Sequence, residues 1–411
     1  MIIIILMIVI KRPGETERIR KLKKWVLLYG RRKTGKTFLV ENFVNYDEYF
    51  FVKRDGGIIS RRGDRTLEYE TFVEILKRGL AHGGTVVVDE FHRLGDEFLD
   101  FVHYMRKEGK LILISSTLFL SKKLFFSRSP LLGFFAEVPL GLIEMRDSLK
   151  TLRKFESDKK LLFEMALLFR EPIAIGYFEG TRDRMEIMAE ILRGSTRTVP
   201  ALVGEIFLEE ERQITGIYEG ILRAIASGKV VSGKISSFLY SRRLIKKDDP
   251  SIVQRHLANL VEMGVIKRIG VYGKRKYVYK HVSPLTKLYY YADEKYNISE
   301  RTLTLTEAKR IVNEVMPYLV EDCVREVLAN KFGLAESVVE ARDFDVDACL
   351  LRFKRPEIAV EVKWKRKVTD GEVRKAEENL NRIRVKRRIL FVPDKSRIHS
   401  ETLEVMDVSN L

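Results

Sequence analysis

Residues 29–37, YGRRKTGKT, have the residue types and the spacing of a phosphate-binding loop. They fit the pattern G-x-x-x-x-G-K-[ST] at every fixed position, through Gly30, Gly35, Lys36 and Thr37. Glycines there let successive backbone N–H groups point at one phosphate, because glycine adopts backbone angles that other residues avoid. The lysine would reach the β- and γ-phosphates of a nucleoside triphosphate, and the threonine hydroxyl is a ligand for Mg²⁺.

The segments that flank this loop also match what the motif needs. An apolar run at residues 25–28 predicts a strand before it, and residues 38–43 predict a helix whose positive end faces the same anion. A chance loop of glycine and lysine is the alternative, but it would not be expected between a strand and a helix. We therefore predict an ATP site, with Mg²⁺ as its metal, made of Gly30, Arg31, Arg32, Lys33, Thr34, Gly35, Lys36 and Thr37.

Two adjacent carboxylates follow a second predicted strand. Residues 85–88, TVVV, are strand-forming residues after a Gly-Gly break, and Asp89 and Glu90 come next. Beside a phosphate loop, one such carboxylate can hold Mg²⁺, directly or through water, and a second can orient the attacking water as a general base. We assign Asp89 to the metal and Glu90 to the water. The alternative is an ordinary buried strand whose next residues are acidic and exposed.

A third predicted strand, residues 111–117, ends in the hydroxyl side chains of Ser115, Ser116 and Thr117. In a nucleotide-hydrolysing protein, a polar group at this position could sense the γ-phosphate. Serine and threonine also end many strands that have no such role.

Composition limits the classes of protein to consider. The 411 residues suffice for two to four domains, and Lys and Arg exceed Asp and Glu by 75 to 58, a net charge of +17. This excess makes a polyanionic partner such as DNA plausible, although solubility or adaptation to heat would give the same charge. Two cysteines cannot form a disulfide framework, so a reducing cytoplasm is expected. The six histidines lack the spacing of zinc ligands.

The first ten residues are almost wholly apolar. They are too few to span a bilayer, and neither a basic segment nor a small-residue cleavage site flanks them as in a signal peptide. We therefore expect a β-strand there and no membrane association.

Hydrophobic periodicity divides the rest of the N-terminal half into two parts. In residues 1–145 short apolar strands alternate with helical stretches, which predicts a parallel sheet covered by helices, with ligand at the carboxyl ends of the strands. Residues 146–212 are helical in pattern, with helices expected at 148–155, 158–169 and 182–192. We expect these helices to form a lid packed beside the nucleotide.

Residues 213–290 predict three helices and a β-hairpin, the order of a winged helix-turn-helix. The third helix, residues 250–264, begins at a capped proline and ends at a glycine. Its apolar side chains are expected to face the core: Ile252, Val253, Leu257, Leu260 and Val261. Its polar side chains are expected to stay outside, where they could contact DNA: Gln254, Arg255, His256 and Asn259. Modules of this kind also dock proteins or separate domains, which is the alternative.

The C-terminal part, residues 291–411, contains a second group of residues that could do chemistry. Residues 344–351 and 357–365 predict two strands of a hairpin, which would place Asp347 opposite residues 361 to 363. Asp347 and Glu361 could then hold Mg²⁺ beside a scissile phosphate, and Lys363 could stabilise the developing charge. A polar strand face without catalytic function is the alternative.

Taken together, these motifs resemble the archaeal ATPase family, in which a P-loop module of the AAA+ kind precedes a winged helix and a restriction-endonuclease-like domain. YGRRKTGKT, VVVDEFHRL and FDVDACLL followed by AVEVKWK carry the resemblance. It implies roles for Asp347, Glu361 and Lys363 in the last domain, and Glu321 is the matching choice for a further acidic residue. The family tends to have a Gly-Arg pair after Ser-Pro-Leu, whereas here Phe134 follows Gly133, so Arg128 is left as a candidate charge sensor.

We therefore expect an α/β protein with four parts: a P-loop ATPase core at 1–145, a helical lid at 146–212, a winged helix-turn-helix at 213–290 and a nuclease-like α/β domain at 291–411. The expected function is ATP binding and hydrolysis in association with DNA, with Lys36 and Glu90 as catalytic residues and possible metal-dependent cleavage at the C-terminal site. The alternative function is a nucleotide-dependent switch or assembly protein with slow hydrolysis and an inactive nuclease-like domain. An oligomer is compatible with either.

Overall fold

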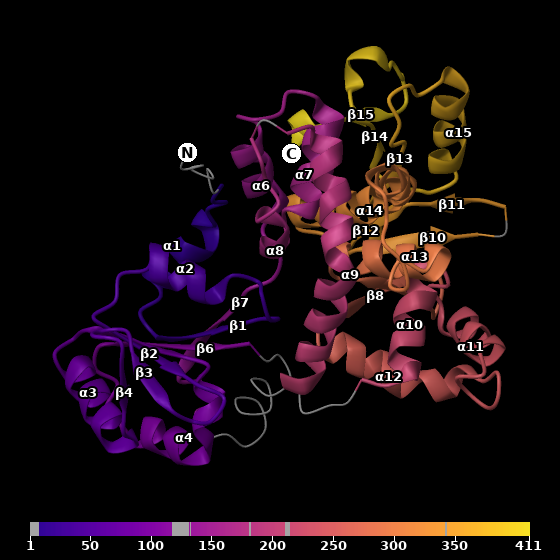
Figure 1. The fold of residues 1–411 in the computed structure, drawn as a ribbon. Helices are drawn as coiled ribbons and strands as arrows, with labels where there is room; N and C mark the ends of the chain where they lie inside the picture. The colour runs from indigo at the N-terminus through magenta and orange to yellow at the C-terminus, as the bar shows by residue number, and fades with distance from the viewer. Residues whose placement is uncertain (1–7, 117–130, 132, 181, 210–213, 342) are drawn as a thin grey trace.

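The computed structural model describes residues 8–116, 131, 133–180, 182–209, 214–341 and 343–411, which Figure 1 shows as a ribbon. They form a seven-stranded sheet in the N-terminal half, a group of helices beside it, and two four-stranded sheets in the C-terminal half. None of the helices in this part of the chain has both the length and the apolar composition that crossing a bilayer requires. Of the strand expected at the start of the chain, residues 1–7 lie outside the described part, and residues 8–10 are not in a strand.

The large sheet has the strand order β4-β3-β2-β5-β6-β1-β7. Strands β2, β5, β6, β1 and β7 are parallel, as the alternating pattern predicts, and β3 and β4 add an antiparallel edge that it did not indicate. The strands are Trp25–Tyr29 (β1), Glu48–Val52 (β2), Ile58–Ser60 (β3), Arg65–Leu67 (β4), Thr85–Asp89 (β5), Lys110–Ser115 (β6) and Phe135–Pro139 (β7).

Helices cover both faces of this sheet. Consecutive residues of a strand face opposite sides, so Trp25 and Leu27 pack with one set of helices, and Val26 and Leu28 with the other. Because both faces are buried, the strands are apolar throughout and do not alternate with polar residues. The helices are Pro13–Lys21 (α1) and Lys36–Phe43 (α2) on one face, and Tyr69–Ala81 (α3) and Gly95–Tyr104 (α4) on the other; the 3₁₀ turn Phe91–Leu94 (η1) follows β5.

The helical region after the sheet differs from the predicted lid. Its helices are Met145–Leu152 (α6), Lys159–Leu168 (α7), Pro172–Ile175 (α8) and Arg184–Glu209 (α9). The last was predicted to end near residue 192, but it continues through Pro200. Helix α9 packs mainly on helices of the C-terminal half, and α7 packs on α6, on α9 and on those helices. All of them share one continuous apolar core, and the short α8 approaches the phosphate loop. Most of the region therefore connects the two halves of the protein.

The predicted three helices and hairpin are present. They are Gly216–Ala226 (α10), Ser232–Ser241 (α11), Pro250–Glu262 (α12), Ile266–Val271 (β8) and Tyr277–His281 (β9). The hairpin does not stand alone, because β8 also pairs in parallel with Ser337–Glu340 (β10), and β10 pairs with Asp345–Val346 (β11). We call the hairpin of β8 and β9 the wing. It is half of a four-stranded sheet whose other half, β10 and β11, belongs to the C-terminal region.

The C-terminal region combines long helices with a second small sheet. Sheet order is β12-β13-β14-β15, with β12 antiparallel to β13 and the others parallel. One face packs on α15 and the other joins the core shared with α7 and α14. The elements are Pro284–Tyr296 (α13), Leu305–Phe332 (α14), Ala348–Arg352 (β12), Arg355–Val362 (β13), Asp370–Asn381 (α15), Arg387–Phe391 (β14), Lys395–Arg397 (η2), Glu404–Met406 (β15) and Val408–Asn410 (η3).

The single strand predicted at residues 344–351 is wrong. The chain leaves one sheet after Val346 and enters the other at Ala348, so Asp347 lies at the junction between β11 and β12. The predicted hairpin turn is correct in position, since Phe353 and Lys354 have left-handed backbone angles between β12 and β13.

Candidate functional site

The predicted phosphate loop lies between β1 and α2 and has the backbone of an anion-binding turn. Lys33 and Gly35 both have positive φ angles, 63° and 87°, which is typical of loops whose N–H groups converge on an anion. A side chain at Gly30 would place its Cβ 2.1 Å from the carbonyl oxygen of Leu140, at the end of β7. Glycine is therefore required at position 30 by the close approach of a neighbouring backbone segment.

Lys36 begins α2 and turns back onto the loop. Its Nζ donates to the carbonyl oxygens of Gly30, at 2.8 Å, and Arg31, at 3.0 Å, and its side chain is buried. The Thr34 hydroxyl donates to the Arg31 carbonyl as well. Carbonyl oxygens hold the ammonium at the rim of the loop, where phosphate oxygens could replace them as acceptors.

Asp89 ends β5 directly behind Thr37. Its Oδ2 accepts hydrogen bonds from the Thr37 hydroxyl, at 2.7 Å, and from the Tyr49 hydroxyl, at 2.8 Å. The side chain is fully buried, and burial raises the pKa of its carboxyl. Its Oδ1 has no hydrogen-bond partner among the residues that the structure describes. A buried carboxylate oxygen without a partner is costly, so a cation reached through Thr37 or through a water would suit this group.

Glu90 is held by several side chains at the start of η1. Its backbone is left-handed, with φ 58°, and its Oε2 accepts a hydrogen bond of 2.8 Å from the Ser116 hydroxyl. Arg93 lies 3.4 Å and His92 3.5 Å from the same oxygen. Arg93 also donates to the Val52 carbonyl at the end of β2. The structure thus places the predicted sensor residue Ser116 against the predicted general base.

Lys36, Thr37 and Glu90 line one pocket of about 640 Å³, and Asp89 lies behind Thr37 at its wall. Its polar side chains include those of the loop, Glu90 and Ser116, and its apolar wall includes two residues of α8. The lining residues are Arg32, Lys33, Gly35, Lys36, Thr37, Phe38, Phe51, Lys53, Arg54, Glu90, Arg93, Ser116, Pro172 and Ile173. A pocket with cations at one side and apolar groups at the other has the size and character of a nucleotide site.

Two side chains of the loop point to the helical region. Arg31 forms a buried ion pair with Glu171, at 2.8 Å, and Arg32 pairs with Glu205 of α9, also at 2.8 Å. Arg31 is not among the residues that line the pocket, so any contact it makes with phosphate would come from its backbone. Thr117 and Arg128, the other sensor candidates, lie outside the described residues.

Sequence reasoning missed Tyr49 and Arg93. Tyr49 is a buried residue of β2, the strand beside β5, and its hydroxyl contacts Asp89. Strand order could not be read from the sequence, so nothing placed this hydroxyl near the carboxylate. Arg93 lies three residues after Glu90. In a helical segment this spacing places two side chains about one turn apart, so it could have indicated the contact.

The C-terminal residues also come together. Ala348 pairs with Val360, so the next residues, Asp347 and Glu361, are neighbours. The backbone N–H of Val362 donates to Asp347 Oδ2, at 2.8 Å, and Lys363 donates to Glu361 Oε1, at 2.7 Å. Glu361 Oε2 is buried, and no residue in the described ranges is its hydrogen-bond partner.

The carboxyls of this group repel one another. Burial, followed by the charges of Glu321 and Glu361, holds the pKa of Asp347 well above its ordinary value. Burial also raises the pKa values of Glu321 and Glu361, whereas Glu361 raises the pKa of Lys363 against the effect of burial. Within the described parts of the chain, no three His, Cys, Asp or Glu side chains are arranged to hold a metal ion. Asp347, Glu361 and Lys363 thus lie close together, as the predicted hairpin implies. One oxygen of each carboxylate already accepts a hydrogen bond, from the Val362 N–H in Asp347 and from Lys363 in Glu361.

The surface of α12 is only partly as predicted. Gln254 and Arg255 are exposed, but Ile252, expected in the core, is 37% exposed in the first turn of α12. Asn259 donates to the hydroxyl of Tyr218, and the ring of His256 packs edge-on against the same tyrosine. These two residues therefore stabilise the packing of α12 on α10.

The wing carries fewer unpaired cations than its sequence suggests. Lys276 pairs with Glu340 at 2.6 Å, and Lys274 donates to the carbonyl of the same residue. Arg275 remains exposed at the tip.

Comparison with known proteins agrees with the fold. No protein-family model and no curated protein sequence matches the chain. A Walker-type ATPase of Pyrococcus abyssi matches in structure with a TM-score of 0.53 and 20% identity, over 69% of this chain and 96% of that chain. The ORC2 protein of Aeropyrum pernix has a TM-score of 0.37 at 13% identity, over 75% and 94% of the two chains. The ORC1 protein of the same organism has 0.32 at 16%, over 72% and 96%.

Of these three structures, the Pyrococcus ATPase alone has a TM-score above 0.5, and at 20% identity it shows similarity of fold. It agrees with the seven-stranded, mostly parallel sheet that carries the phosphate loop. It adds no support for a nuclease-like C-terminal domain. The described chain is thus an α/β protein with a mixed, mostly parallel seven-stranded sheet, consistent with the fold of a P-loop core, and two additional small sheets.

Proposed function

We propose that this protein binds ATP at the pocket between the phosphate loop and α8 and hydrolyses it. The observation that carries the proposal is the hydrogen bond between Thr37 and Asp89, beside Lys36, with one buried carboxylate oxygen of Asp89 lacking a partner. Loop hydroxyl, buried carboxylate and lysine are the groups that this class of enzyme requires on Mg²⁺ and the terminal phosphates.

Each residue has a distinct role in this proposal. The loop amides and Lys36 bind the β- and γ-phosphates, and the lysine exchanges its contacts with the loop carbonyls for phosphate oxygens. Thr37 and Asp89 would hold Mg²⁺, which neutralises phosphate charge when bound. Glu90 orients the attacking water and accepts its proton. Because Glu90 is already bonded to Ser116, its carboxylate is positioned before substrate arrives.

Arg93 supplies a cation beside Glu90 in a chain that lacks the Gly-Arg pair of the family it resembles. It lines the same pocket as Lys36 and Thr37. We propose that its guanidinium faces the phosphate that the water attacks, so hydrolysis would not depend on Arg128.

The test is release of phosphate from ATP with and without Mg²⁺, and with and without duplex or single-stranded DNA. The proposal predicts Mg²⁺-dependent turnover. Tight ATP binding without turnover, and without any effect of DNA, would instead favour the switch. The contacts that hold Glu90 to Ser116 and Arg93 are the observation that makes the switch the second candidate, since they could also restrain the base.

DNA association is a further part of the proposal. It rests on the exposed Gln254, Arg255 and Arg275 and on the net charge of +17. Salt-dependent binding to duplex DNA would support it, and binding that is absent even at low salt would contradict it.

Metal-dependent cleavage at the C-terminal group is the least supported part. It rests on the convergence of Asp347, Glu361 and Lys363, with Glu321 close enough to shift the pKa of Asp347. If cleavage is observed with Mg²⁺ or Mn²⁺, an Asp347→Ala/Lys363→Ala variant should abolish it. Cleavage that persists in this variant would assign it elsewhere.

A further inference from the structure

Two consecutive charged residues, Arg170 and Glu171, connect the nucleotide pocket to the C-terminal half. Both are buried, and they lie between α7 and α8. Glu171 forms the ion pair with Arg31 of the phosphate loop, whereas Arg170 forms an ion pair of 2.5 Å with Glu326 of α14. One short segment thus contacts the loop on one side and the long helix on the other.

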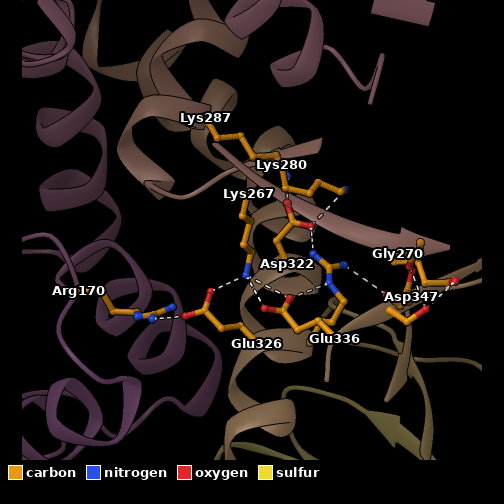
Figure 2. A network of polar contacts seen from close by, with 12 residues as sticks. Arg170, Lys267, Gly270, Lys280, Lys287, Asp322, Glu326, Glu336 and Asp347 are labelled. Carbon is orange, nitrogen blue, oxygen red and sulfur yellow. Dashed lines mark hydrogen bonds and ion pairs between the residues drawn. The ribbon is translucent and has the colours of Figure 1, made fainter. Parts of the chain in front are cut away.

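From Glu326 the ion pairs continue into the wing and the C-terminal strands, as Figure 2 shows. Lys267 of the wing strand β8 bridges Glu326, at 2.7 Å, and Glu336, at 2.8 Å. Glu336 immediately precedes β10, the strand that extends the wing.

Arg325 completes the connection. Its Nε lies 3.2 Å from Glu336, its Nη2 contacts Asp322 at 2.7 Å, and its Nη1 donates to the backbone carbonyl of Asp347 at 3.3 Å. The guanidinium is almost fully buried. The ion pairs therefore reach the junction between the two C-terminal sheets, beside the C-terminal carboxylates.

Two carboxylates, Glu326 of the network and its neighbour Asp322, have pKa values held below their ordinary range. Burial would raise the pKa of Glu326, but Arg170 and Lys267 lower it to about 2. The pKa of Asp322 is likewise held well below its ordinary value, because Lys280, Lys287 and Arg325 outweigh its burial. Buried charges of this kind need partners, so displacement of one member leaves its neighbour unpaired and favours a concerted rearrangement.

Nucleotide would act directly on the first members. Pro172 and Ile173 follow Glu171 in the chain and form the wall of the nucleotide pocket. Pro172 also lies against the loop, since a Cβ at Gly35 would be 3.7 Å from its ring. A nucleotide in this pocket therefore contacts the segment that carries Arg170 and Glu171.

We propose that the ion-pair network from Arg31 through Glu171, Arg170, Glu326, Lys267, Glu336 and Arg325 transmits nucleotide occupancy to the wing and to the strands around Asp347. This inference rests on nucleotide binding as proposed above. Coupling between two sites is reciprocal, so a ligand of the wing would change nucleotide affinity by the same factor.

The experiment is amide hydrogen exchange on β8, β10 and residues 345–352, with and without a non-hydrolysable ATP analogue and Mg²⁺. In the wild type, bound analogue should change exchange in these strands by about fivefold or more. Glu326→Gln, which keeps the shape of the side chain, should reduce the change to less than about twofold while analogue affinity stays within about threefold. Glu171→Gln should interrupt the network at its end nearer the phosphate loop. It should likewise reduce the change in hydrogen exchange that the analogue causes in these strands to less than about twofold.

Glu186→Gln is the matched control. Glu186 pairs with Lys309 at 2.9 Å and also joins α9 to α14, but it lies outside the network. This variant should respond to analogue as the wild type does. Thermal unfolding of each variant identifies any that is not folded.

Three results would overturn the inference: no change in the wild-type strands when analogue is bound, a full response in Glu326→Gln, or an equal loss in Glu186→Gln. Analogue affinity is measured separately by calorimetry. Absence of analogue binding to the wild type would overturn the proposed function itself, and with it the input that the network needs.

Discussion

The proposed nucleotide site and the C-terminal carboxylate group each have a buried carboxylate oxygen, Asp89 Oδ1 and Glu361 Oε2, for which the described part of the chain offers no hydrogen-bond partner. They differ in what surrounds that oxygen. In the pocket, Asp89 is bonded to two hydroxyls and Lys36 to backbone carbonyls. In the C-terminal group, the carboxylate is paired with its own lysine.

This difference indicates how ready each site is for a ligand. Hydroxyls and carbonyls are neutral partners, which phosphate and Mg²⁺ can replace. The C-terminal group already has a cation, Lys363, bonded to Glu361. Besides burial, the charges of Glu321 and Glu361 raise the pKa of Asp347. We therefore expect the pocket to bind its ligand more readily than the C-terminal group.

The largest expected effect is on turnover. Glu90→Gln removes the general base but keeps the size of the side chain and a group able to contact Ser116. Turnover should fall by about 10²–10⁴-fold, with ATP affinity nearly unchanged. Phosphate release and calorimetry measure the two quantities. Full turnover in this variant would remove Glu90 from the mechanism.

The next effect concerns Mg²⁺ in the pocket. Asp89→Asn should weaken the gain in ATP affinity that Mg²⁺ provides by about tenfold or more, because a neutral amide is a poor partner for the cation. Tyr49→Phe removes only one hydrogen bond to Asp89, so about threefold is expected. Titrations with and without Mg²⁺ provide the test, and equal Mg²⁺ effects in Asp89→Asn and the wild type would count against the assignment.

A smaller effect is expected on the free energy of unfolding of the protein, through Asp347 of the C-terminal group. The raised pKa of Asp347 means that the folded state binds its proton more tightly than the unfolded state. Stability from this group is therefore fully present below the ordinary carboxyl pKa and is lost as pH rises through the raised value. Asp347→Asn should increase the free energy of unfolding by about 1 kcal/mol at pH 8 and have little effect at pH 4.

Denaturant unfolding at both pH values measures this difference. The asparagine can still accept the hydrogen bond from Val362, so packing should be preserved. If Mg²⁺ or Mn²⁺ binds here, it should stabilise the wild type more at pH 8 than at pH 6, because it needs ionised carboxylates. Destabilisation by Asp347→Asn at pH 8 would contradict the repulsion inferred for this group.

The smallest effect is expected at the DNA surface. Arg255→Ala should weaken duplex DNA binding about threefold and lower the slope of affinity against salt by about one. Arg62→Ala is the control, because Arg62 is exposed beside the antiparallel edge of the N-terminal sheet. Equal losses in both variants would indicate nonspecific attraction by the whole surface.

The two regions also differ in how far the sequence predicts them. The phosphate loop and the end of β5 are local patterns in which residue types and spacing indicate the chemistry. The sequence alone therefore predicts that Lys36, Thr37, Asp89 and Glu90 act together, and in the structure Asp89 accepts a hydrogen bond from Thr37, while Lys36, Thr37 and Glu90 line one pocket. Their role as a nucleotide site stays a prediction. The contacts of Tyr49 and Arg31 depend on strand order and on helices far away in the chain, which local patterns do not contain.

The absence of long-range information in local sequence patterns also explains where the predicted fold differs from the structure. The three helices and the hairpin of the wing follow local periodicity and are present, but the pairing of β8 with β10 joins residues about 67 positions apart, Ser337 and Gly270. The break at Asp347 follows from that pairing, since β11 joins the wing sheet and β12 another sheet. Ile252 was misplaced because helical periodicity does not show where the neighbouring elements end.

The most direct test of the account is ATP binding with Mg²⁺ to the wild type, Lys36→Ala and Lys33→Ala, measured by calorimetry. Lys33 lines the pocket but is exposed, whereas Lys36 is buried against the loop. We predict a loss of affinity of about 100-fold or more in Lys36→Ala, equal to about 2.7 kcal/mol, and less than about threefold in Lys33→Ala. Unchanged affinity in Lys36→Ala would contradict the central claim that this loop binds the phosphates of a nucleotide.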